Sequence, residues 1–236
     1  MNSELTILLV TAFSIGFIHT LIGPDHYLPF IVMARARKWS LNKTLFITVL
    51  CGIGHVLGSV IIGLIGVAGG LAVGLLENVE SVRGNIASWV LIGVGFAYGI
   101  WGLRVAWRSR EHTHTHLHDD TEHTHPHTHS HLGRHVHLHG NTKSITPWAL
   151  FIVFVLGPCE PLIPILMYPA AAGHWSNLIW VTLAFGVTTI STMTIIVAVA
   201  TKGLMNFRLG FLEKYVHVLA GGIIALSGLA IKAFGL

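Results

Sequence analysis

Long apolar runs with very few charged residues are the feature that most constrains this chain. Six such runs cover roughly residues 5–34, 44–72, 85–105, 146–170, 177–201 and 215–235. A helix needs about 20 predominantly apolar residues to cross the hydrocarbon core of a bilayer. Only 10% of the residues are charged, against roughly 25% in a soluble domain. The sequence therefore predicts an all-α polytopic membrane protein with six transmembrane helices, and it excludes an ordinary soluble enzyme.

The segments between the runs predict the orientation. Lys and Arg gather between the first and second runs, between the fifth and sixth, and directly after the third. Because cytoplasmic loops are enriched in these residues, we expect all three segments in the cytoplasm of a bacterial inner membrane and both termini outside. The segment with Glu77, Glu80 and Arg83 is then expected to face outward. The basic pI of 9.3 reflects these loops, so no nucleic-acid partner is expected.

The two ends of the chain repeat each other. A shift of 134 residues lays Gly23-Pro24-Asp25-His26 onto Gly157-Pro158-Cys159-Glu160. This divides the chain into a first three-span half (1–110), a central segment (111–143) and a second three-span half (144–236). Because three is odd, the halves have opposite orientations, which is the inverted-repeat plan of many transporters.

The matched stretch also predicts a break in the first helix of each half. Proline lacks an amide donor and clashes with the preceding turn, so Gly23-Pro24 and Gly157-Pro158 interrupt a continuous helix. Broken helices at matching positions of two halves point to a binding site near the middle of the membrane.

Ionisable side chains gather at these breaks. Each costs roughly 2.5–3.5 kcal/mol at the centre of a bilayer, so such groups persist where they face a partner, a cavity or an ion. Imidazole, carboxylate and thiolate together suit a divalent transition-metal ion, whose binding would compete with protons. Two structural alternatives stay open, a buried Asp–His ion pair and a cysteine that only fills space. The candidate metal ligands are His19, Asp25, His26, His55, Cys159 and Glu160.

The central segment has twelve histidines in the 28 residues from His112 to His139, mostly alternating with other residues. No apolar core can form from this composition, so we expect a disordered cytoplasmic loop that captures metal ions. The loop ligands are His112, His114, His116, His118, His123, His125, His127, His129, His131, His135, His137 and His139.

The motif from His19 to Asp25-His26, His55 and the second motif Gly157-Pro158-Cys159 resemble those of the nickel/cobalt transporter superfamily. The closest likeness in plan is to its six-span efflux permeases with a histidine-rich loop. The resemblance implies transport of nickel or cobalt, with efflux favoured over uptake by analogy. It implies divalent metal ions and the bilayer as partners, no prosthetic group and no enzymatic activity, and it leaves a homo-oligomer open.

Two other functions remain as alternatives. The Pro-Cys motif also resembles that of membrane thiol–disulfide electron carriers, which use one cysteine in each half. In this chain Asp25 stands where the first cysteine would be, and the second cysteine of the sequence is Cys51. The other alternative is a membrane-anchored metal-binding accessory protein, whose spans would have no need of the two breaks.

Overall fold

The computed structural model describes residues 3–70, 72–108, 112–118, 121–127, 145–159, 161–206 and 210–234. Its helices are α1 Ser3–Ile22, η1 Pro24–His26, α2 Leu28–Ala36, α3 Leu41–Ala68, α4 Val73–Arg108, α5 Ile145–Leu156, α6 Leu162–Ala171, α7 Trp175–Asn206, η2 Gly210–Tyr215 and α8 Val216–Phe234. Two strands, β1 His112–His118 and β2 Thr121–His127, pair antiparallel.

Within the described residues, five helical segments are long and apolar enough to cross a membrane. They are Ser3–Ile22, Leu41–Ala68, Val73–Trp107, Trp175–Leu204 and Gly210–Ala233. Large apolar side chains such as Phe46, Leu183 and Val199 are exposed on them. Apolar exposure on this scale suits lipid and would be a liability in water. Apart from the short hairpin of β1 and β2, the described elements are helices, so the prediction of an all-α membrane protein is confirmed.

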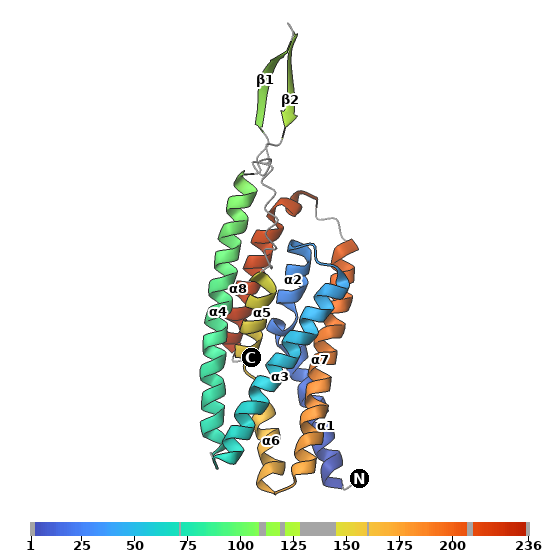
Figure 1. The fold of residues 1–236 in the computed structure, drawn as a ribbon, viewed down its shortest axis with the longest axis vertical. Coiled ribbons are helices and arrows are strands. Elements are labelled where there is room, and N and C mark those ends of the chain that lie inside the picture. Colours follow the sequence, from blue (N-terminus) through green and yellow to red (C-terminus); the bar gives the residue numbers. More distant parts are fainter. Residues whose placement is uncertain are drawn as a thin grey trace.

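The first and fourth apolar runs are each divided into two helices. The first consists of α1 and α2, with the short η1 between them, and the fourth consists of α5 and α6. In Figure 1, α1 and α6 occupy the lower end of the bundle, while α2 and α5 lie nearer the end that carries the strands. The breaks therefore fall inside the bundle, at the Gly-Pro pairs.

Helices α4 and α8 lie side by side over much of their length (Figure 1). A Cβ atom on Gly95 would lie 2.7 Å from the carbonyl oxygen of Gly221. Such a contact is too short for any larger residue, and small residues are what allow helix backbones to approach closely in membranes. The glycines thus set the spacing of this pair.

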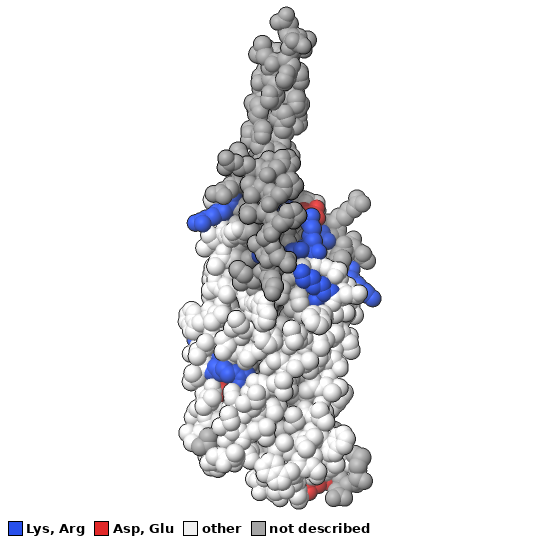
Figure 2. Space-filling view, in the orientation of Figure 1, with Lys and Arg blue, Asp and Glu red and all other residues white. Residues whose placement is uncertain are grey.

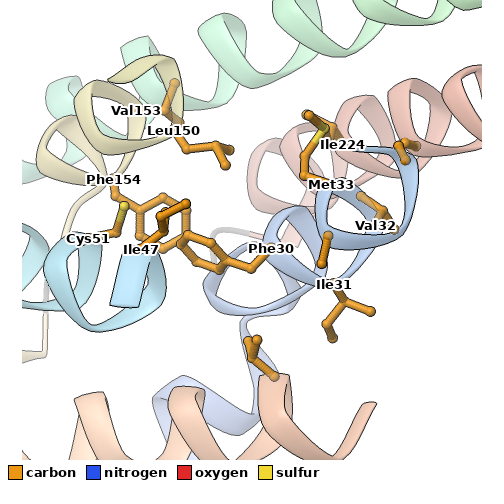
Figure 3. Close-up of a cluster of buried hydrophobic side chains, with 14 of the residues drawn as sticks. Phe30, Ile31, Val32, Met33, Ile47, Cys51, Leu150, Val153, Phe154 and Ile224 are labelled. Carbon is orange, nitrogen blue, oxygen red and sulfur yellow. The ribbon is translucent and has the colours of Figure 1, made fainter. Parts of the chain in front are cut away.

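Apolar side chains fill the interior in two clusters. The first joins α2, α3 and α5, with the Phe30 and Phe154 ring centroids 4.5 Å apart and Cys51 beside them (Figure 3). The second lies around Cys159, Leu162 and Phe185. The two cysteines therefore lie in different surroundings, and both are free thiols.

The structure corrects the expected start of the third span. Helix α4 begins at Val73, so Glu77, Glu80 and Arg83 lie within it and not in an outward loop. Glu80 is fully buried and is paired with Arg83 one turn later. A charge can remain in the interior when it has such a partner. The charges of Glu80 and Arg83 therefore lie inside the helix and do not mark where the third span starts.

Part of the histidine-rich segment forms a β-hairpin, while the disorder expected of the whole loop stays a prediction. In β1 and β2, His112 pairs with His127 and His118 pairs with Thr121. The alternation of Thr with His has the two-residue period of a strand, and Thr favours strands. The predicted ligands from His129 to His139 lie outside the described residues.

Candidate functional site

The first break brings His26 into the interior. Helix α1 ends where the amide of Gly23 donates to the carbonyl of His19, at 3.0 Å, and Pro24 starts the 3-10 turn η1. A Cβ atom on Gly23 would lie 2.5 Å from Nδ1 of His26. Glycine is therefore required here because the backbone passes so close to the histidine ring.

Three histidines meet at this break. One ring nitrogen from each of His19, His26 and His55 lies within 4.8 Å of the other two. The ring centroids of His19 and His26 are 4.8 Å apart, and those of His26 and His55 are 5.1 Å apart. His26 and His55 are each only 2% exposed. Residues from α1, η1 and α3 thus converge on one buried point.

Asp25 lies next to this group of histidines. Its Oδ1 atom is 3.3 Å from Nδ1 of His26, and its side chain is 18% exposed. Nδ1 of His26 also lies 3.2 Å from the carbonyl oxygen of Gly23. The Asp25 carboxylate therefore interacts electrostatically with the His26 ring at its Nδ1 atom.

The second break is held by two charged residues of α4, the buried Glu80 and the partly buried Arg83. Glu80 accepts a hydrogen bond from the backbone amide of Cys159 at 3.0 Å. Arg83 donates to the carbonyl of Gly157 at 2.6 Å, to that of Leu156 at 3.2 Å, and to Glu80. These bonds satisfy backbone groups that the interruption of the helix leaves unpaired.

His55 connects the two breaks. Its Nδ1 atom lies 3.2 Å from the carbonyl oxygen of Phe154, in the last turn of α5. A Cβ atom on Gly157 would lie 3.3 Å from the same nitrogen. The second break therefore lies directly behind the ring that completes the group of histidines.

The structure thus brings together four of the six candidate ligands, namely His19, Asp25, His26 and His55. Cys159 is fully buried at the second break, within the apolar cluster of Leu162 and Phe185. Glu160 lies outside the described residues.

Sequence reasoning missed Glu80 and Arg83 as residues of the site. Ser59 donates to Glu80 at 3.2 Å and accepts from Arg83 at 3.1 Å, so all three belong to the network that holds the second break. One signal could have identified Glu80 and Arg83. They are three positions apart, so on a helix they lie on the same face and can form an ion pair.

Comparison with known proteins corrects the family. Residues 27–230 match the family described as "Cytochrome C biogenesis protein transmembrane region". No curated protein and no solved structure matches the chain. The match overturns the assignment to the nickel/cobalt transporters, and with it the prediction of metal transport. It begins after His26, so it does not include most of the motif on which that resemblance depended. The chain belongs to the family of cytochrome c biogenesis protein transmembrane regions.

Proposed function

We propose that the protein is a membrane thiol–disulfide carrier that serves cytochrome c biogenesis. The observation that carries this proposal is the position of Cys159 at the second helix break, inside the region matched by the family. Cys51, on α3, is the other thiol in that region. Each cysteine belongs to one half of the chain, as expected for a carrier with one redox cysteine in each half.

The proposed cycle transfers two electrons. The thiolate of Cys159 attacks a disulfide of a partner protein and forms a mixed disulfide, releasing one partner thiol. Cys51 then displaces the second partner sulfur and forms the Cys51–Cys159 disulfide. Two carrier thiols are oxidised, one partner disulfide is reduced to two thiols, and the two carrier protons pass to the partner. A dithiol on the other side of the membrane then reduces the carrier by the reverse exchange.

The cycle requires the second break to move. Cys51 packs against Phe154 in one apolar cluster, while Cys159 belongs to the other. Phe154 and Cys159 are separated by only four residues, Val155 to Pro158, of which the last two are no longer helical. Rearrangement of this short stretch is the smallest change that brings the Cys159 sulfur toward α3.

We further propose six spans arranged as two inverted three-helix halves, with α1–α2 and α5–α6 as the broken first span of each half. Two observations support this. The chain passes from α1 to α2 in the opposite direction to its passage from α5 to α6 (Figure 1). Gly95 and Gly221, which a looser match of the two halves at an offset of 126 residues aligns, contact each other, as residues beside a two-fold axis would.

The same proposal places the strand-bearing end in the cytoplasm of a bacterial inner membrane. Lys and Arg gather near that end in Figure 2, and a broad region with few charges lies below them. An excess of these residues marks the cytoplasmic side of a membrane protein.

Electron transfer across a sealed bilayer tests the proposed function. Proteoliposomes containing the full chain are loaded with Ellman's reagent, a charged disulfide, and a charged phosphine reductant is added outside. We expect thiolate release inside for the unaltered protein, and loss of this signal in Cys51→Ser and in Cys159→Ser. Ser227→Ala is the matched control, because Ser227 is a small buried residue that belongs to neither cysteine cluster. A full rate in either cysteine variant would refute the proposal.

A further inference from the structure

The group of three histidines is not explained by thiol exchange. Two of its members, His19 and His26, precede residue 27, where the family match begins. Among the described residues, these three are also the group of His, Cys, Asp or Glu side chains close enough to hold a metal ion. We propose that His19, His26 and His55 form a resident site for a borderline divalent transition-metal ion, of the class of Zn²⁺ and Co²⁺. This goes beyond the proposed function and does not involve transport.

The backbone fixes which nitrogen of two of the rings is available. Nδ1 of His26 lies 3.2 Å from the carbonyl of Gly23, and Nδ1 of His55 lies 3.2 Å from the carbonyl of Phe154. A carbonyl oxygen can only accept, so each Nδ1 carries the hydrogen and each Nε2 presents a lone pair. A hydrogen bond from the second ring nitrogen is the usual support for a histidine that binds a metal.

The nitrogens left over are buried and unsatisfied. Nε2 of His19, of His26 and of His55 has no hydrogen-bond partner among the described residues. An unpaired polar atom in an interior costs about 1–3 kcal/mol, and here three such atoms belong to adjoining rings. A single ion that accepts all three lone pairs removes the whole cost, so the three orphaned atoms have one common explanation.

The spacing is suitable for an ion after a small adjustment. Tetrahedral coordination with metal–nitrogen bonds of about 2.0–2.1 Å places ligand nitrogens about 3.3 Å apart. One ring nitrogen of each histidine lies within 4.8 Å of a ring nitrogen of each of the other two. Small rotations of the rings about their side-chain bonds would close this difference without displacing α1 or α3.

Asp25 supplies charge rather than a ligand. Three neutral imidazoles leave a divalent ion with two uncompensated positive charges inside the membrane, where charge is costly. The Asp25 carboxylate lies 3.3 Å from Nδ1 of His26. It offsets one of the two positive charges and makes His26 a stronger metal ligand. With three protein ligands, the ion keeps a fourth position open, as in catalytic and not in structural zinc sites.

Packing alone is the competing explanation. The three rings meet edge to face, at 81° and 87°, a favourable arrangement for neutral aromatic rings without any ion. Packing and metal binding make opposite predictions when a metal is added, so a binding measurement separates them.

The test uses Co²⁺, whose visible absorption is strong in tetrahedral sites and weak in octahedral ones. The parent protein is the full chain with the twelve loop histidines replaced by Gln, so that they bind no metal. We expect one Co²⁺ per chain in detergent micelles with a tetrahedral spectrum. His26→Gln and His55→Gln should each weaken binding about 10- to 100-fold.

Two controls make the outcome decisive. His217→Gln should bind as the parent does, because His217 pairs with Tyr98 on another helix pair. Cys159→Ser should also bind normally, so a failure of the proposed thiol function would leave this result unaffected. Thermal unfolding of each variant without metal checks that it is folded. Absence of tetrahedral Co²⁺ in a folded parent, or unchanged binding in folded His55→Gln, would overturn the proposal.

Discussion

Replacing Arg83 by Met should strongly destabilise the protein. Arg83 donates to Glu80, to Ser59 and to the carbonyls of Leu156 and Gly157. Its loss leaves the carboxylate of Glu80, which is fully buried, without a cation. Removing one partner of a buried ion pair costs about 3–5 kcal/mol, mostly because the other charge stays behind. We therefore expect Arg83→Met to lower the free energy of unfolding by that amount.

The same reasoning predicts that a second change restores part of the loss. Glu80→Gln removes the stranded charge, while its amide oxygen still accepts from the Cys159 amide. Coupling between residues in contact reaches about 0.5–3 kcal/mol. Arg83→Met/Glu80→Gln should therefore be more stable than Arg83→Met alone, by about 2 kcal/mol.

Unfolding by sodium dodecyl sulfate in mixed micelles is followed by far-ultraviolet circular dichroism. The free energy of unfolding is compared for the unaltered protein, Arg83→Met, Glu80→Gln and the double variant. A matched control is Arg104→Met, which removes an exposed cation from the same helix. Exposed changes of this kind usually alter stability by less than about 0.5 kcal/mol. If Arg83→Met costs less than 1 kcal/mol, or if the double variant equals the sum of the single ones, Arg83 does not hold the break.

Three further outcomes are expected. Phe30→Ala should cost about 3–5 kcal/mol of unfolding free energy in the same assay, since Phe30 is fully buried, whereas the exposed Phe46→Ala should cost far less. Gly221→Leu should separate α4 from α8 and lower the midpoint of unfolding, and an unchanged midpoint would contradict the close contact. Gly23→Ala should weaken Co²⁺ binding in the loop-substituted parent, because the added methyl displaces the ring of His26. Equal affinity there would show that the ring is free to move.

The sequence was sufficient for features that depend on local chemistry. Glycine followed by proline interrupts a helix wherever it occurs, so both breaks could be located from the residues alone. The meeting of His26 with His55 was accessible too, because ionisable groups in apolar segments must find partners. In each case a general cost, either steric or electrostatic, left few alternatives.

Features that depend on distant partners could not be found this way. Glu80 and Arg83 look like the end of a span until it is known that the backbone of residues 156–159 lies against them. The family was missed for a related reason. The motif from His19 to His26 is conspicuous, but it lies outside residues 27–230, over which the family likeness is spread. A short pattern of metal-ligating residues describes one site and not the rest of the fold.

The hydrogen-bond partners of the last carbonyls of α5 allow the second break to lie in the protein interior. The last carbonyls of a helix have no partner in their own helix, and they are usually left to water or to a cap. In α5, side chains from neighbouring helices take over this role, with His55 at Phe154 and Arg83 at Leu156 and Gly157. The interrupted backbone is therefore satisfied entirely by protein groups at these three positions. Cys159 is therefore held on non-helical chain while it stays fully buried, so a reaction partner reaches its thiol only where the protein gives access.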